Sequence, residues 1–300
     1  MRRLEAVLTR LTDPLLGGLT SLALRGLAST DPDRASDLCG AAARRLGPLL
    51  PAHRIGQANL RAAYPDKDPA WIEATLRGAW ENLGRLAGEY AHLGRLWDYD
   101  PARPNSGRIV TDDAALFLEL LNDGKPALCF TAHLGNWELP AVMATVHGMP
   151  SAVVYRMPNN RAAAAEITRI RTPLMGRLIR TRPEAVLEMA AALRRGEHLG
   201  TVVDQHFSRG VDVTFFGRRC KANPTIARLA RQFDCPVVGV WVIRLPGGQF
   251  RIRGVGPIEM PRDTSARVDV TAATQKITSI VEGWIRDHPE QWLWFHRRWR

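Results

Sequence analysis

The stretch LCFTAHLGNWELP, residues 128–140, places a histidine and a carboxylate directly after an apolar run. The first three residues predict a buried strand, Gly135 and Asn136 predict a turn, and the residues after them predict a helix. In open α/β sheets, ligands bind beyond the carboxyl ends of the strands. We therefore expect His133 at a strand end and Glu138 one turn later, as candidates for chemistry.

A histidine beside a carboxylate can carry out acid–base catalysis. Imidazole titrates near neutral pH, so His133 could take a proton from a hydroxyl group and return it later. Glu138 could fix the imidazole tautomer if the turn folds the helix start back onto the strand end. VVDQHF, residues 202–207, offers Asp204 as a rival partner at a second predicted strand end. The alternatives are a structural role for His133 and a capping role for Asp204.

Other catalytic classes lack their sequence signatures. The chain has no GxSxG elbow and no SxxK motif, so a serine acyl-enzyme is unsupported. It has no HExxH or CxxC motif, and Asp204 with His206 would make an incomplete metal shell. We therefore expect no metal or other cofactor. The four cysteines have no paired spacing, which indicates a reduced compartment without disulfides.

The charge of the chain favours anionic partners. Lys and Arg number 41 and Asp and Glu number 30, which gives a net charge of +11, and most of the cations are Arg. A guanidinium group forms forked hydrogen bonds with phosphate and carboxylate groups. Nucleic acid, anionic lipid and an acidic carrier protein all fit this charge. No nucleic-acid-binding module is recognisable, so we expect no nucleic acid partner.

Hydrophobic periodicity changes along the chain and predicts an α/β fold. Residues 1–100 read as helical, with helices expected at 33–50 and 69–97. From residue 127 we expect strands at 127–131, 152–155, 199–203, 237–243 and 249–253, and helices at 136–146, 183–195, 224–233 and 266–288. The first two strands have the spacing of a βαβ crossover. The fold class is therefore α/β, with a mixed central sheet flanked by helices and a helical N-terminal layer.

The N-terminal stretch DPLLGGLTSLALRGLAS, residues 13–29, is apolar but short. Its uncharged run is below the roughly 20 residues that a spanning helix needs. It could lie in the membrane interface, with neighbouring arginines on lipid phosphates, or form a core helix. We expect residues 1–30 to be a membrane-associating segment and residues 31–300 to form one catalytic domain.

Four ordered motifs carry a resemblance to a known family: TAHLGNWE, YRMPNN, VVDQHFSRGVDVTFFG and HPEQWLWFHRRWR. From about Arg54 onward the chain resembles the late acyltransferases of lipid A biosynthesis. These are the lauroyl and myristoyl transferases of Gram-negative bacteria, within the lysophospholipid acyltransferase superfamily. The chain is also similar to mycobacterial phosphatidylinositol mannoside acyltransferases.

The resemblance implies transfer of a fatty acyl group from a thioester to a hydroxyl group of an anionic glycolipid such as a lipid A precursor. Acyl carrier protein or coenzyme A would carry the acyl group. It implies that His133 is the general base and Glu138 its partner, without a covalent enzyme intermediate. Backbone N–H groups near Gly135 and Asn136 are candidate donors to the oxyanion. It also implies the cytoplasmic face of the inner membrane, with peripheral or monotopic attachment or one N-terminal anchor.

Several residues outside the histidine motif are candidates for substrate binding. Arg156, Asn159 and Asn160 of YRMPNN could hold a phosphate or sugar, or form an ordinary turn. Gln205 stands in the second wall of the predicted cleft. The apolar strand that ends in Phe215, Phe216 and Gly217 could line the acyl chain or belong to the core. The run Arg169, Arg171, Arg177, Arg180 and Arg182 could hold lipid phosphates or form a solvated face.

The C-terminal WLWFHRRWR has two interpretations. Its tryptophans and arginines could sit together at a bilayer interface, or the tryptophans could fill the core while the arginines stay in water. A thioesterase or lipase is a further alternative for the whole chain, with water as the acyl acceptor. The missing nucleophile elbow disfavours that alternative.

Overall fold

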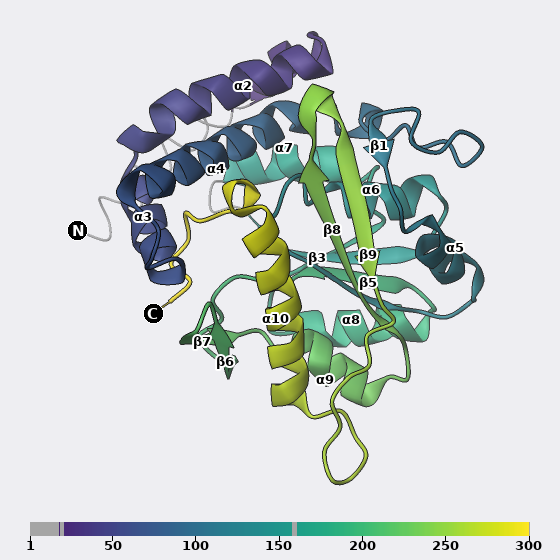
Figure 1. The fold of residues 1–300 in the computed structure, drawn as a ribbon. Helices are drawn as coiled ribbons and strands as arrows, with labels where there is room; N and C mark the ends of the chain where they lie inside the picture. Colours follow the sequence, from purple (N-terminus) through teal and green to yellow (C-terminus); the bar gives the residue numbers. More distant parts are fainter. Residues whose placement is uncertain (1–17, 19–20, 158–160, 300) are drawn as a thin grey trace, which may run out of the picture.

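The computed structural model describes residues 18, 21–157 and 161–299 (Figure 1). The N-terminal layer is helical, as predicted. Its elements are α2 (Pro32–Leu46), η1 (Gly47–Leu49), α3 (Pro51–Ala63), α4 (Pro69–Tyr90) and η2 (Leu93–Arg95). The side chains of Asp31 and Asp68 cap α2 and α4 by accepting backbone N–H bonds, and a proline begins each helix.

The described residues contain a seven-stranded sheet in the order β1-β9-β8-β2-β5-β3-β4. Its strands are β1 (Ile109–Val110), β2 (Leu128–Thr131), β3 (Ser151–Tyr155), β4 (Arg177–Arg180), β5 (His198–Val202), β8 (Val237–Arg244) and β9 (Phe250–Val255). Strands β8, β2, β5, β3 and β4 are parallel, whereas β9 is antiparallel to β8. This confirms the predicted α/β class with a mixed sheet.

Helices cover both faces of the sheet (Figure 1). They are α5 (Ala114–Asn122), α6 (Leu139–Val146), α7 (Arg161–Arg171), α8 (Ala185–Arg194), α9 (Thr225–Gln232) and α10 (Val270–Asp287). A separate hairpin of β6 (Val211–Phe215) and β7 (Arg218–Ala222) packs against α10. The predicted crossover from β2 through α6 to β3 exists, but the two strands are not neighbours because β5 lies between them. The sequence pattern did not predict β1, α5, α7, β4 or β7.

Alternation along the strands divides the core into two clusters. Leu128 and Phe130 of β2 belong to the cluster that includes residues of α8, α9 and α10. Cys129 faces the opposite way and packs with Val240 of β8 and Val142 of α6. Strands buried on both faces are typical of parallel sheets, which explains why β2 reads as a continuous apolar run.

The predicted membrane-associating segment, residues 1–30, lies largely outside the described residues, and the boundary at residue 31 stays a prediction. Within the part of the chain that the structure describes, no helix combines the length and apolar character needed to cross a bilayer.

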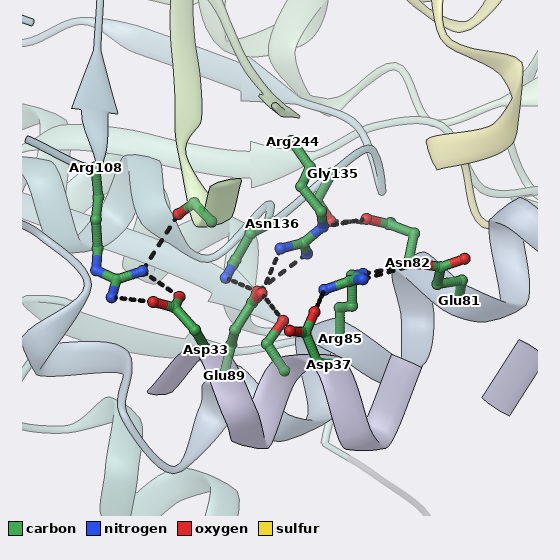
Figure 2. A network of polar contacts seen from close by, with 12 residues as sticks. Asp33, Asp37, Glu81, Asn82, Arg85, Glu89, Arg108, Gly135, Asn136 and Arg244 are labelled. Carbon is green, nitrogen blue, oxygen red and sulfur yellow. Dashed lines mark hydrogen bonds and ion pairs between the residues drawn. The ribbon is translucent and has the colours of Figure 1, made fainter. Parts of the chain in front are cut away.

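A buried ion pair ties the helical layer to the sheet (Figure 2). Glu89 of α4 is 2% exposed and forms a salt bridge with Arg244 at the end of β8. The same carboxylate accepts hydrogen bonds from Ser36 Oγ of α2 at 2.7 Å and from Asn136 Nδ2 of the turn after β2 at 2.8 Å. One carboxylate therefore joins two helices, one strand and the turn that follows His133.

Replacing Glu89 by Ala should destabilise the protein strongly. The buried guanidinium of Arg244 would lose its counter-ion, and breaking a buried pair in this way costs about 3–5 kcal/mol. Urea unfolding measures the loss. The control is Glu188→Ala, because Glu188 forms an exposed pair with Arg182 and such pairs contribute about 0–1 kcal/mol. Equal losses for the two variants would contradict the structural role of Glu89.

Candidate active site

His133 lies just beyond the carboxyl end of β2, as predicted, and its partner comes from the neighbouring strand. Asp204 follows the end of β5, which pairs with β2 in parallel. His133 Nδ1 lies 2.7 Å from Asp204 Oδ1. The side chain of His133 is 18% exposed and that of Asp204 is fully buried. The topology thus brings together two residues that are 71 positions apart in the sequence.

The carboxylate of Asp204 is held by three donors. Besides the imidazole, Oδ2 accepts the backbone N–H of His133 at 2.9 Å and the indole N–H of Trp292 at 2.6 Å. Burial acts to raise the pKa of Asp204, but His133, His296 and the indole hydrogen bond outweigh it and hold that pKa below its ordinary value. Asp204 is therefore an anion at neutral pH.

This geometry orients the imidazole ring. An anionic acceptor at Nδ1 favours the tautomer that carries its proton on Nδ1 and leaves Nε2 free to accept one. Gln205 Nε2 lies 3.4 Å from His133 Nε2, so the amide of Gln205 stands beside the reactive nitrogen. The edge of the Trp137 ring packs against the imidazole, with ring centroids 5.0 Å apart. His133 is thus positioned as an acid–base group, and Gln205 lies at the site as expected.

The partner of His133 is Asp204, and the predicted contact of His133 with Glu138 is wrong. Glu138 accepts a hydrogen bond from Arg171 Nε at 3.0 Å and pairs with a second nitrogen of the same guanidinium. The turn does not fold the carboxylate back onto the imidazole; it directs Glu138 towards α7. Arg171 also lies over the rings of Tyr90 and Tyr155. Glu138 and Arg171 both line the same cavity as His133.

The backbone N–H of Gly135 is not available to an oxyanion, which corrects that prediction. It donates to the carbonyl of Gln291 at 3.2 Å. Gly135 has a φ of +56°, and a Cβ there would lie 2.2 Å from the carbonyl oxygen of Val242. Close packing therefore requires glycine here. Asn136 is fully buried and directs its side-chain amide to Glu89, so it supports the turn.

The predicted run of phosphate-binding arginines does not form one patch. Three of these arginines have carboxylate partners at the surface: Arg169 with Glu166, Arg177 with Glu197 and Arg182 with Glu188. Arg180 is exposed. Arg171, the candidate for substrate binding, is neutralised by buried Glu138. Most of the run is therefore a solvated face, which was the alternative interpretation.

Phe215, Phe216 and Gly217 do not line the cavity that contains His133, so the predicted acyl-lining role is wrong and the alternative core role fits Phe215 and Phe216. Phe215 and Phe216 are buried in an aromatic cluster with residues of the C-terminal segment. Gly217, with a φ of +70°, lies in the turn of the β6–β7 hairpin. This hairpin position explains why the pair is core rather than an acyl lining.

The C-terminal segment matches neither interpretation fully. Its tryptophans Trp292 and Trp294 lie in the core, but one of its arginines, Arg298, is buried with them. Arg298 lies over the ring of Phe215, and it donates to the carbonyl of Lys221. The segment reaches the active site, because the N–H of Leu293 donates to the carbonyl of His133 at 3.1 Å.

His133 lies at one end of a cavity of about 1060 Å³. We call this end, at the carboxyl edge of the sheet, the mouth. Three exposed arginines line it: Arg156, for which phosphate or sugar binding stays a prediction, with Arg209 and Arg228. Among the described residues, none of the three has a carboxylate within ion-pair distance. Asn159 and Asn160, predicted beside Arg156, lie outside the described residues.

The interior of the cavity is largely apolar. Cys129, Val153 and Val240 line it from one face of the sheet, together with Met143 of α6 and Leu178 of β4. Phe130 and Val154, which point to the opposite face, also border the cavity. Burial raises the pKa of the Cys129 thiol to about 12, so this thiol is protonated near neutral pH and is not a nucleophile. The cavity thus pairs an acid–base group with room for an apolar chain.

The structure thus combines an α/β sheet and a histidine–aspartate pair with a largely apolar cavity, an arrangement that suits a ligand with an apolar part. The family model for bacterial lipid A biosynthesis acyltransferases matches residues 15–300, and the chain belongs to this family. It is therefore an enzyme that transfers acyl groups. A search of curated proteins finds no match.

Sequence reasoning missed several residues of the site. Trp292 was considered only as a membrane or core residue, yet it donates to Asp204. Arg209 and Arg228 reach the mouth from a loop and from α9, and no local pattern distinguishes them from other surface arginines. Glu89 lies in a stretch of ordinary helical periodicity, and nothing in the sequence marks it as buried. Only the tertiary fold reveals these contacts.

A partly buried histidine beside the site, His296, should make stability depend on pH. Burial lowers the pKa of His296 to about 4, although Asp204 acts in the opposite direction. Because an unfolded histidine has a pKa near 6.5, the unfolded state binds more protons between the two values, and stability falls as the pH falls through this window. In the wild type, His296 should therefore lower the free energy of unfolding by about 2 kcal/mol between pH 7 and pH 5, and His296→Gln should abolish this loss.

Urea unfolding of the wild type and of His296→Gln at both pH values measures this difference. His147 is the matched control, because burial lowers its pKa too but it lies far from the site, against Trp97. The loss of unfolding free energy at pH 5 that His296 causes should persist in His147→Gln. An unchanged pH dependence in His296→Gln would contradict the buried, neutral state of this ring.

Proposed function

We propose that this enzyme transfers a fatty acyl group from an acyl thioester to a hydroxyl group of an anionic glycolipid, such as a lipid A precursor. The observation that carries the proposal is the His133–Asp204 pair at the mouth of a long apolar cavity. An acyl chain would lie in the cavity with its carbonyl carbon near His133. The acceptor hydroxyl would approach the mouth from solvent or from a bilayer.

The proposed chemistry follows from the tautomer. Asp204 holds the Nδ1 proton, so Nε2 of His133 accepts the proton of the acceptor hydroxyl as its oxygen attacks the thioester carbonyl. Asp204 stabilises the imidazolium that forms. The tetrahedral intermediate then expels the thiolate, which takes the proton back from Nε2 and leaves as a thiol. The new ester forms without an acyl-enzyme, in agreement with the protonated state of Cys129.

The oxyanion needs a donor, and Gln205 is the best placed candidate among the predicted residues. Its amide nitrogen lies 3.4 Å from His133 Nε2, so it can reach a carbonyl oxygen held beside that nitrogen. Gly135 has its N–H committed to Gln291. We therefore propose that the side chain of Gln205, and not the backbone of Gly135, donates a hydrogen bond to the oxyanion.

The arginines of the mouth suit an anionic acceptor. Arg156, Arg209 and Arg228 are exposed around the entrance to the cavity. A guanidinium binds a phosphate through two parallel hydrogen bonds, which gives both affinity and orientation. A phosphorylated sugar lipid would place its charge on these groups and its hydroxyl near His133. A phosphatidylinositol mannoside offers the same chemistry and is the alternative acceptor.

The net charge of +11 also suits an acidic donor carrier. Acyl carrier protein and coenzyme A are both anionic and both present the acyl group as a thioester. The acyl donor is a substrate, and the proposed reaction uses no other cofactor and no metal.

An exposed apolar surface on the N-terminal layer suits a lipid bilayer. Leu38 and Leu46 of α2, Leu49 of η1 and Leu50 are all at least half exposed, and we call them the leucine surface. Exposed arginines flank it at positions 34, 45 and 54. Apolar side chains bordered by guanidinium groups match the interior and the phosphates of a membrane interface. We propose that the enzyme docks on the cytoplasmic face of the inner membrane through this surface, together with residues 1–30.

Removing the base or its partner should abolish or greatly reduce acyl transfer. His133→Ala removes the group that accepts the proton and should leave no measurable turnover. Asp204→Asn leaves the ring without its anionic partner and should lower kcat by about 10²–10⁴-fold. Steady-state transfer of radiolabelled acyl groups measures both, with circular dichroism as the test of folding. Turnover retained in folded His133→Ala would exclude His133 as the base.

Glu138→Gln is the matched control for Asp204→Asn, because it also neutralises a buried carboxylate of the cavity. The glutamine can still accept a hydrogen bond from Arg171, so kcat should fall less than in Asp204→Asn. A folded Glu138→Gln enzyme that is as inactive as Asp204→Asn would give the partner role back to Glu138.

Polar substitution of the leucine surface should weaken membrane binding. The triple variant Leu46→Ser, Leu49→Ser and Leu50→Ser should lower the partition coefficient at least about 10-fold, because each buried leucine contributes roughly 1.5–3 kcal/mol. Sedimentation with phosphatidylethanolamine–phosphatidylglycerol vesicles measures it. Leu187→Ser, an equally exposed leucine on α8, is the control and should bind as the wild type. Unchanged binding of the triple variant would mean that other surfaces dock.

A further inference from the structure

The end of the cavity remote from His133 carries two polar side chains. His198 begins β5 and Ser151 begins β3, and the two residues are paired across these neighbouring strands. Paired residues of a parallel sheet point to the same face, and both residues line the cavity. They therefore lie side by side at the amino edge of the sheet, whereas His133 lies beyond its carboxyl edge.

Both polar atoms are buried and lack a partner among the described residues. His198 is 5% exposed, and its Nδ1 accepts or donates no hydrogen bond. The hydroxyl oxygen of Ser151 is in the same condition. Burial lowers the pKa of His198, and the opposing effect of Asp123 does not reverse this, so the ring is neutral at pH 7. Together, the neutral ring and the hydroxyl can both donate and accept hydrogen bonds, so they can bind a small polar molecule.

The distance between the two ends matches a fatty acyl chain. His198 lies six positions before Asp204, which corresponds to at most about 20 Å of extended chain. One leaflet of a bilayer, and hence one acyl chain, spans roughly 15 Å, half of the hydrocarbon thickness. A chain with its carbonyl at His133 would thus end close to Ser151 and His198.

We propose that Ser151 and His198 form a polar end stop that sets the greatest length of acyl chain that the enzyme accepts. This inference rests on the proposed function, because it takes the cavity as the acyl site. A short chain leaves room for a water molecule that hydrogen-bonds to both side chains. A longer chain expels that water and presses its methyl end against two polar groups that have no other partner. Such a loss weakens binding on the order of 10- to 100-fold.

Gly200 offers a matched control halfway along the same strand. It lies on the same sheet face as His198, two residues away, and lines the cavity. A Cβ added at Gly200 would meet no atom nearer than 3.9 Å, so a side chain there would fill open space. A larger residue at position 200 should therefore block the cavity before the end stop is reached.

The test measures binding of free fatty acids, so that it does not depend on acyl transfer. Saturated fatty acids of increasing even length are titrated into the full-length protein by calorimetry. In the wild type, affinity should rise with length and then drop at least about 10-fold at the next homologue. Ser151→Ala and His198→Leu should each move this drop to a longer chain, and the double variant should move it furthest. Gly200→Val should move it to a shorter chain.

Thermal unfolding checks that each variant folds. If His198→Leu does not fold, Ser151→Ala still tests the proposal, because it removes only one buried oxygen. A length limit that stays unchanged in folded Ser151→Ala and in the double variant would overturn the end stop. Binding without any dependence on length would also overturn it. Failure of the acyl-transfer assay with a normal fatty-acid profile would instead refute the proposed function alone.

Discussion

The organisation of the active site depends on one buried carboxylate. Asp204 is removed from water, and burial alone would favour its neutral form. It stays charged because the imidazole and backbone N–H of His133 and the indole of Trp292 all donate to it. These three donors come from the end of β2 and from the C-terminal segment. A single anion thus fixes the relative position of two distant parts of the chain.

The same constraint explains the unusual packing around His133. The C-terminal segment must come close to the turn after β2 so that Trp292 can reach Asp204. Leu293 bonds to the carbonyl of His133, and Gln291 accepts the N–H of Gly135. On its other side this turn packs against β8, where the carbonyl of Val242 leaves no space for a Cβ at position 135. Glu89, which is paired with Arg244, holds the other side of the turn through the side chain of Asn136 (Figure 2).

Much of the fold could be predicted from periodicity, because strands and helices of this size leave a local pattern. The strand ends that carry His133 and Asp204 were both located in this way. The choice between Glu138 and Asp204 as partner could not be made, because it depends on which strands are neighbours. β5 inserts between β2 and β3, and nothing local to either strand encodes this order.

The arginines illustrate the same limit. A run of five within a short segment looked like a phosphate site, yet carboxylates that lie near it in the fold neutralise most of them. The arginines that remain available at the mouth come from three separate segments. Likewise Phe215 and Phe216 are core residues because the hairpin turns them towards the C-terminal tryptophans. Charge and apolarity are visible in a sequence, but their partners are not.

The most direct test of the role of Asp204 is the ¹⁵N chemical shift of each imidazole nitrogen of His133, assigned by comparison with His133→Gln. In the resting enzyme, at a pH where the ring is neutral, Nδ1 should carry the proton and Nε2 should have the shift of an unprotonated nitrogen. A neutral ring protonated on Nε2, with a bare Nδ1, would contradict the account.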